Sequence, residues 1–183
     1  PRAGMRFLCY LPWHHSFGGL FERFFVLSTG GRLAIDDSWG KNTDRLIEYF
    51  KFIQPSIYFS VPKVYQDIVS RVLSHKEIEN LFFHDKLKFC FTAAAPLPKP
   101  ISDVFKSHKI HVVEGWGLTE TSPCCTLTPI ALEREVGVVG FPLPEVEIKL
   151  GNENEIIVRG PNIMKGYFKD EISTKQALDE EGW

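Results

Sequence analysis

The sequence lacks a cysteine pattern that would indicate a disulfide framework or a metal site. Its four cysteines, Cys9, Cys90, Cys124 and Cys125, form no CxxC pair and have no histidines at ligand spacing. Unpaired thiols of this kind predict a reducing compartment, so we expect a cytoplasmic protein. We interpret the adjacent Cys124 and Cys125 as packing residues rather than a redox pair.

Long apolar runs and an excess of charge are also missing. No run reaches the roughly 20 residues needed to cross a bilayer, and no signal-peptide pattern opens the chain. The formal net charge of −2 gives no basic excess for binding nucleic acid or a strongly anionic membrane. With 44% hydrophobic residues among 183, the chain is expected to form a globular fold with a sizeable core.

Three common catalytic signatures are absent as well. There is no nucleophile elbow, no Walker-type lysine loop and no zinc signature, which argues against a serine hydrolase and a P-loop protein. Both ends of the chain look like cuts through a longer protein. We therefore expect further N- and C-terminal parts of the same polypeptide.

What is present is an alternation of β-branched or aromatic runs with helical patterns. Strands are expected at residues 6–11, 32–35, 56–61, 87–92 and 110–114. Helices are expected at residues 18–27, 44–52, 62–73 and 100–107. This alternation predicts an α/β fold with a mostly parallel sheet flanked by helices.

Short signals predict the ends of these helices. The first helix carries three apolar residues on one face: Leu20, Phe24 and Leu27. Gly30 and Gly31 end it, Thr43 is the expected N-cap of the second helix, and Pro62 suits the first turn of the third.

The pattern changes near residue 128. Short strands are expected at 136–139, 146–150 and 155–159, and a helix at 173–178. A tight turn at 151–154 between the last two strands predicts a hairpin. We therefore expect two incomplete subdomains, an α/β part at 1–128 and a part of a small antiparallel β-barrel or sheet at 129–183.

Ligands of parallel sheets bind beyond the carboxyl ends of the strands. That rule selects three loops, which follow Leu11, Thr92 and Glu114. The third loop, GWGLTETSP at 115–123, places an aromatic ring between two glycines, then a hydroxyl and a carboxylate. The ring can stack on a flat base, the hydroxyl can bind phosphate and the carboxylate can hold Mg²⁺. The alternative is a glycine-rich turn with a buried tryptophan.

The other two loops carry weaker signals. TAAAPLP at 92–98 has small residues that let the backbone approach a ligand, although an ordinary packing loop has the same composition. LPWHHSFGG at 11–19 has adjacent histidines, which point in different directions in an extended segment. At most one of His14 and His15 is therefore expected to bind a carboxylate or phosphate, and a structural role for both stays open.

Taken together and in this order, the three loops resemble the motifs of the adenylate-forming, or AMP-binding, superfamily. GWGLTETSP is similar to its adenine-and-metal loop, and the stretch 155–183 resembles the segment leading to its ribose-binding aspartate. The phrases FERFF at 21–25 and PSIYFSVPKVY at 55–65 look most like long-chain acyl-CoA synthetases. LPWHHSFGG and LAIDD at 33–37 also resemble feruloyl-CoA synthetases.

The resemblance implies an ATP-dependent carboxylic acid–CoA ligase that forms an acyl-adenylate with ATP and Mg²⁺ and transfers the acyl group to CoA. His15 would meet the carboxylate and the α-phosphate, Thr119 would bind phosphate, and Glu120 would hold Mg²⁺. Phe17 and Cys124 would line the pocket for a fatty or aromatic acid. The implied nucleotide-contacting residues, which also include Thr119, are Ala93, Ala94, Ala95, Gly115, Trp116 and Gly117.

The chain also departs from the family pattern. It contains neither the Ser/Thr/Gly-rich phosphate loop nor the later catalytic lysine, and Asn154 stands where a glycine is usual. The isolated chain is therefore expected to have little or no ligase activity. Two alternatives stay open: a non-catalytic nucleotide-binding or interaction module of the same fold, and an adenylation domain that loads a carrier protein.

Overall fold

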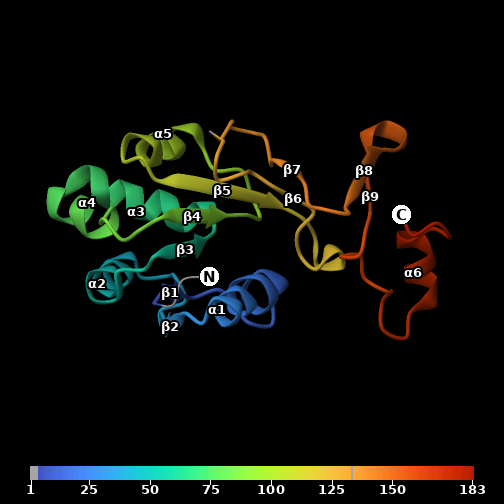
Figure 1. Cartoon of the computed structure of the whole chain (residues 1–183), viewed down its shortest axis with the longest axis horizontal. Helices are drawn as coiled ribbons and strands as arrows, with labels where there is room; N and C mark the ends of the chain where they lie inside the picture. Colours follow the sequence, from blue (N-terminus) through green and yellow to red (C-terminus); the bar gives the residue numbers. More distant parts are fainter. Residues whose placement is uncertain (1–3, 133) are drawn as a thin grey trace.

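The computed structural model describes residues 4–132 and 134–183 and shows an α/β architecture (Figure 1). Seven strands of this part form one sheet in the order β2-β1-β3-β4-β5-β6-β7, in which the first five strands are parallel. The strands are β1 (Arg6–Cys9), β2 (Arg32–Ile35), β3 (Ile57–Ser60), β4 (Phe89–Thr92), β5 (His111–Trp116), β6 (Thr126–Leu127) and β7 (Phe141–Pro142). β6 and β7 join antiparallel, and Pro142 lies on the edge strand, where a missing N–H is tolerated.

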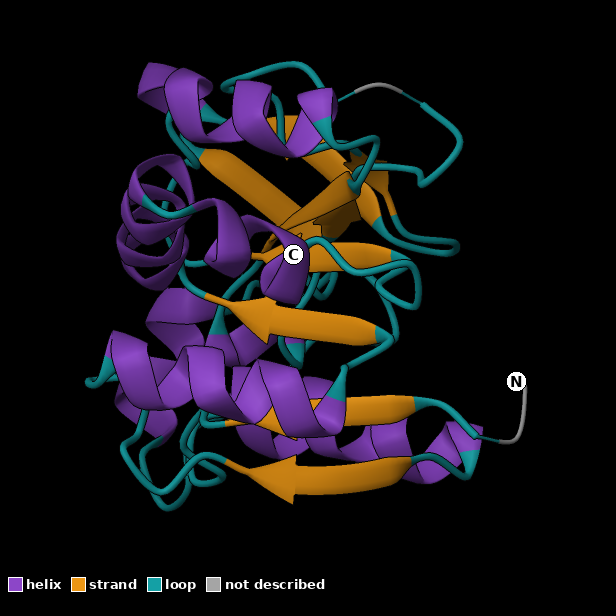
Figure 2. Cartoon of the chain, turned by 90° about the vertical axis from the view of Figure 1, so that its left-hand side faces the viewer, coloured by secondary structure: helices purple, strands orange, loops and turns teal. Residues whose placement is uncertain are grey.

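Helices cover both faces of this sheet (Figure 2). They are the π-helix η1 (Phe17–Glu22), α1 (Arg23–Thr29), α2 (Thr43–Ile53), α3 (Pro62–Ser74), α4 (Lys76–Phe82) and α5 (Lys99–Ser107). Neighbouring residues of a strand point to opposite faces. Tyr58 packs against Phe50 of α2 and Phe82 of α4, whereas Phe59 packs against Phe25 of α1. The η1–α1 segment therefore lies on the opposite face from α2 and α4.

The core lies on both sides of the central strands. Phe50 and Phe82 are fully buried with ring centroids 4.6 Å apart, and Tyr65 donates hydrogen bonds to the carbonyls of Tyr58 and Phe91. Burying one large apolar side chain of this kind contributes about 1.5–3 kcal/mol. Among the described residues, no helix has the length and apolar character of a membrane span.

A two-stranded antiparallel sheet lies beyond one end of the main sheet (Figure 1). It pairs β8 (Glu147–Leu150) with β9 (Ile156–Arg159) through a turn that contains the 3₁₀-helix η3 (Asn152–Asn154). The helix α6 (Glu171–Ala177) follows. The predicted hairpin and the predicted α/β class are confirmed, with strand ends within one residue of those expected for the hairpin.

Several local predictions were wrong. Asn42, not Thr43, caps α2: its backbone is extended and its side-chain oxygen accepts a hydrogen bond from the Arg45 amide at 3.0 Å. β1 ends at Cys9 rather than at residue 11. The helix expected at 18–27 is a π-helical turn followed by an α-helix, and its shared face of Leu20, Phe24 and Leu27 is exposed.

Two further differences have clear physical reasons. The strand expected at 136–139 is a turn closed by a hydrogen bond from the Val138 amide to the Glu135 carbonyl, with Gly137 at a φ of 86°. Its valines suit a strand but find no partner strand among the described residues. The helix α4 was missed because it begins right after α3, and His75 is both the last cap of α3 and the first cap of α4.

Candidate functional site

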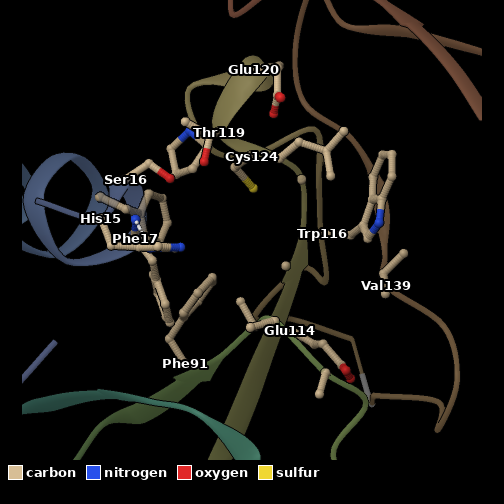
Figure 3. A pocket seen from close by; sticks show the side chains of 18 of the residues that line it. His15, Ser16, Phe17, Phe91, Glu114, Trp116, Thr119, Glu120, Cys124 and Val139 are labelled. Carbon is tan, nitrogen blue, oxygen red and sulfur yellow. Dashed lines mark hydrogen bonds between the residues drawn. The ribbon is translucent and has the colours of Figure 1, made fainter. Parts of the chain in front are cut away.

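The three selected loops meet around a single cavity of about 530 Å³ beyond the carboxyl ends of β4 and β5 (Figure 3). Every residue predicted for the site lines it: His15, Phe17, Ala93, Ala94, Ala95, Gly115, Trp116, Gly117, Thr119, Glu120 and Cys124. The parallel strand order brings these loops together, because consecutive parallel strands place their carboxyl ends at the same edge of a sheet.

The loop before η1 is held close to the π-helix. A Cβ atom at Gly19 would collide with the carbonyl oxygen of Trp13, so this turn requires glycine. The backbone amide of Phe17 donates to Nδ1 of His15 at 3.1 Å. In the neutral imidazole, an accepting Nδ1 leaves the proton on Nε2. His15 thus offers a donor to the cavity, whereas His14 does not line it.

The alanine loop passes along another wall. Ala94 has a φ of 74°, in the left-handed region that costs a non-glycine residue about 1 kcal/mol or more. Strained backbone of this kind is frequent where a loop must follow the shape of a ligand. Below the loop, Phe91 packs against Phe21 and Phe17 with ring centroids 4.8 and 5.5 Å apart, which makes this end of the cavity apolar.

The third loop begins later than expected, because pairing with β6 extends β5 to Trp116. The Trp116 ring lies at the cavity wall near Val139 (Figure 3). Gly117 follows directly, and a Cβ atom there would collide with the Pro123 carbonyl oxygen. The chain then forms the 3₁₀-helix η2 (Thr119–Thr121), which brings Thr119 and Glu120 to the rim of the cavity.

A segment far along the chain positions Glu120. The hydroxyl of Tyr167 donates to Oε1 of Glu120 at 2.9 Å, and the amide of Met164 donates to the Glu120 carbonyl at 2.8 Å. The hydrogen bond to Glu120 raises the pKa of Tyr167, so this phenol keeps its proton and stays a donor. Sequence reasoning missed Tyr167, because a partner 47 residues away leaves no local pattern.

The thiol in the cavity wall is not a nucleophile. Cys124 is 7% exposed, and burial raises its pKa to about 11. Its thiol donates to the Thr126 carbonyl at 3.1 Å. All four cysteines are buried and free, which agrees with packing roles. Sequence reasoning also missed Phe21, Glu114 and Val139, which line the cavity but lie outside the motifs or at their edges.

The donor set suits a magnesium ion that is bound mainly by its substrate. No group of three His, Cys, Asp or Glu side chains that could hold a metal exists among the described residues. Mg²⁺ typically takes one or two protein carboxylates and completes its octahedron with phosphate oxygens and water. Glu120, next to the Thr119 hydroxyl at the cavity rim, fits that arrangement.

Comparison with known proteins gives consistent matches. Residues 2–168 match the family described as AMP-binding enzyme. Probable 4-coumarate–CoA ligase 3 of Dictyostelium discoideum is 29% identical over 187 residues, covering 94% of this chain and 32% of that protein. Long chain acyl-CoA synthetase 6, peroxisomal, of Arabidopsis thaliana is 27% identical, covering 97% of this chain and 32% of that protein.

A solved structure shares the fold over the same length. A malonyl-CoA ligase, in a ternary product complex with methylmalonyl-CoA and AMP bound, matches with a TM-score of 0.81 and 26% identity. The match covers 99% of this chain and 40% of that chain. The present chain spans about a third of the length of the curated relatives it matches.

Proposed function

Because the chain belongs to the AMP-binding enzyme family, we propose that the complete protein is an ATP-dependent carboxylic acid–CoA ligase, that is, an acyl-CoA synthetase. The resemblance to acid–CoA ligases that the motifs indicated is confirmed by these relatives. The reaction would join a carboxylic acid to the AMP part of ATP with release of pyrophosphate, and then transfer the acyl group to the thiol of CoA with release of AMP.

One observation carries this proposal: three loops far apart in the sequence line one cavity with complementary chemistry. The cavity combines an aromatic ring, a donor imidazole, a hydroxyl and a carboxylate with an apolar end. A nucleotide and an organic acid together need this set of contacts.

In the proposed reaction each residue has a separate role. Trp116 stacks on adenine between Gly115 and Gly117, and the backbone of Ala93, Ala94 and Ala95 runs along the base. His15 donates from Nε2 to the oxygens where negative charge develops as the carboxylate attacks the α-phosphorus. Thr119 binds a phosphate oxygen. Glu120 holds Mg²⁺, which neutralises phosphate charge when it is bound.

The acid would bind at the apolar end of the cavity. Phe17, Phe21 and Phe91 pack together at this end, and Cys124 also lines the cavity. Aromatic side chains and an uncharged thiol bury a hydrocarbon group favourably but offer little to a charged substituent. A fatty or an aromatic acid is therefore the proposed substrate.

We also propose the wider setting of this activity. The chain would divide near residue 128 into an α/β subdomain (1–128) and a β-rich subdomain (129–183), each completed by further parts of the same polypeptide. The free thiols fit a reducing compartment such as the cytoplasm. The proposed partners are small molecules: the acid, ATP and CoA.

ATP–pyrophosphate exchange tests the proposal. The complete protein is incubated with Mg²⁺, labelled pyrophosphate and a panel of fatty and aromatic acids. Exchange that depends on the acid is expected, and CoA should then release an acyl thioester. Thioester formation on a carrier protein but not on CoA would favour the carrier-loading alternative. Nucleotide binding without exchange for any acid would favour a non-catalytic module.

The 183-residue chain alone provides a second test. It contains no Ser/Thr/Gly-rich phosphate loop and no later catalytic lysine, so exchange should be absent or far slower than in the complete protein. Robust exchange by the chain alone would show that the contacts assigned to the missing segments are dispensable.

A further inference from the structure

A buried ion pair lies at the wall of the cavity, which Glu114 lines and its partner Arg134 does not. Arg134 and Glu114 approach to 2.5 Å, and their side chains are only 5% and 3% exposed. The other paired arginines, among them Arg71 with Asp44, keep at least a third of their side chains exposed. Removing two charges from water is costly, so this pair needs a compensating arrangement of hydrogen bonds.

Arg134 supplies that arrangement by joining three elements around the site. Its guanidinium donates to the Glu114 carboxylate on β5, to the Ser102 hydroxyl on α5 at 3.0 Å, and to the Leu97 carbonyl at 3.1 Å. Leu97 is fully buried and follows Pro96, the last residue of the alanine loop to line the cavity. One side chain thus fixes the far end of the alanine loop to the strand that carries Trp116.

Arg134 also anchors the connection between β6 and β7. This connection leaves β6 next to Thr128, whose hydroxyl bonds the Glu114 backbone, and returns at Gly140. A Cβ atom at Gly140 would collide with the Leu127 backbone, so the returning chain lies tightly on β6. Immediately before Gly140, Val139 lines the cavity near the Trp116 ring (Figure 3).

We propose that Arg134 is a positioning residue for the nucleotide: through its buried pair with Glu114 it fixes the spacing between the alanine loop, Trp116 and Val139. This inference rests on the proposed function, and it adds a residue that touches neither the base nor the phosphates. The slot for a flat base is defined by these walls, and misplacing a binding group by about 1 Å can cost up to roughly 100-fold in activity.

Binding of the acid provides an internal control for the effect on nucleotide binding. The aromatic lining of the acid end is formed by Phe17, Phe21 and Phe91, and Arg134 hydrogen-bonds none of these. Loss of the Arg134 hydrogen bonds should therefore weaken ATP binding far more than acid binding. A purely structural role would instead reduce the amount of folded protein and leave the Michaelis constants of the folded fraction unchanged.

The experiment compares Arg134→Met with the wild type in the complete protein. Exchange kinetics give the KM for ATP, the KM for the acid and kcat, and calorimetry gives the Kd for AMP. We expect the KM for ATP and the Kd for AMP to rise roughly ten- to a hundredfold, with the KM for the acid changed by less than about threefold. Arg71→Met is the matched control, because it removes an exposed arginine–aspartate pair.

A second variant keeps the test decisive if Arg134→Met does not fold. Arg134→Lys keeps a positive charge beside Glu114, but a single ammonium cannot reproduce the planar fork that reaches Leu97 and Ser102 together. It should fold and still raise the KM for ATP severalfold. In Glu114→Gln/Arg134→Met no charge is left unpaired, so its melting temperature should recover relative to Arg134→Met, whereas nucleotide affinity should not.

The outcomes separate the two proposals. A lowered melting temperature with an unchanged Kd for AMP in Arg134→Met and Arg134→Lys would overturn the positioning role. If the wild type binds AMP but exchanges pyrophosphate with no acid, the ligase proposal fails, and the Kd comparison still decides the role of Arg134. A wild type that binds no nucleotide would overturn both.

Discussion

The position of the Trp116 ring is fixed by its neighbours in the sequence and in the sheet. Gly117 must be glycine because of the Pro123 carbonyl, and pairing with β6 fixes the Trp116 backbone. The ring is therefore positioned before any ligand arrives. Such a residue should contribute mainly binding affinity, whereas Glu120, at the rim, should contribute mainly to the metal-dependent step.

Replacing the stacking ring gives the first prediction. Trp116→Ala in the complete protein should weaken ATP binding by about 1–3 kcal/mol, the range for stacking of a base on an aromatic ring. Titration calorimetry measures the change. Trp39→Ala serves as the control, because Trp39 is 60% exposed and does not line the cavity. Equal ATP affinities for the two variants would remove Trp116 from the adenine site.

The phenol that positions Glu120 gives the second prediction. Tyr167→Phe removes one hydrogen bond to the carboxylate and nothing else, so the Mg²⁺ concentration for half-maximal exchange should rise severalfold. Glu120→Gln should raise it further and also lower turnover. Tyr49→Phe, which loses a comparable bond to Asp37 on the surface, should behave as the wild type. A normal Mg²⁺ dependence in Tyr167→Phe would show that this bond does not orient the carboxylate.

At the scale of single elements, the start of α2 shows which of two adjacent polar residues caps the helix. Asn42 has an extended backbone and caps the helix, while Thr43 is its first helical residue. Both residue types are good N-caps, so composition alone does not choose between them. The choice depends on where the chain leaves the loop that follows β2, which Asp36 fixes by accepting bonds from the Ser38 and Gly40 amides.

This assignment gives the third prediction. Asn42→Ala should lower the free energy of unfolding by about 0.5–2 kcal/mol, because the Arg45 amide loses its acceptor. Thr43→Ala should be nearly neutral. Urea unfolding followed by circular dichroism measures both. The reverse order would restore Thr43 as the cap.

For the whole molecule, the least expected feature is a carboxyl inside the core. Glu22 is 1% exposed on the face of η1 toward the sheet, and its Oε2 atom has no hydrogen-bond partner among the described residues. Burial raises the pKa of this carboxyl to about 8, although the neighbouring Cys9 thiol lowers it in part. The group is therefore neutral in the folded protein near neutral pH and ionised in the unfolded chain.

The sign of the resulting pH dependence follows from proton binding. Between the ordinary pKa of 4.5 and the folded value of about 8, the unfolded state binds fewer protons than the folded state. Stability should therefore fall as pH rises through this window, by on the order of 5 kcal/mol in total. Below pH 4.5 this contribution is fully present.

Glu22→Gln isolates this effect as the fourth prediction. Glutamine stays neutral, so the difference in unfolding free energy between variant and wild type should shift in favour of the variant as pH rises from 4.5 to 8. Urea unfolding at several pH values measures it. Glu48→Gln, an exposed change on α2, should show no such trend. A constant difference across the window would mean that Glu22 ionises normally.

The sequence by itself determined most of the elements and the three loops, because these depend on near neighbours. Alternating apolar runs, Gly30 after α1, Pro62 at the start of α3 and the turn at 151–154 all act within a few residues. The order of parallel strands then implies a shared edge, so the cavity was predictable in outline, together with eleven of the residues that line it. The roles of those residues stay predictions.

Only the tertiary structure decided which distant side chains complete the site. Tyr167 reaches Glu120 across 47 residues, and Arg134 reaches Glu114 across 20 and Leu97 across 37. The valines at 136–139 form a turn despite their strand propensity, because a strand needs a partner and propensity does not supply one. Hydrogen bonds between distant segments depend on the packed arrangement of the whole chain, which no local pattern encodes.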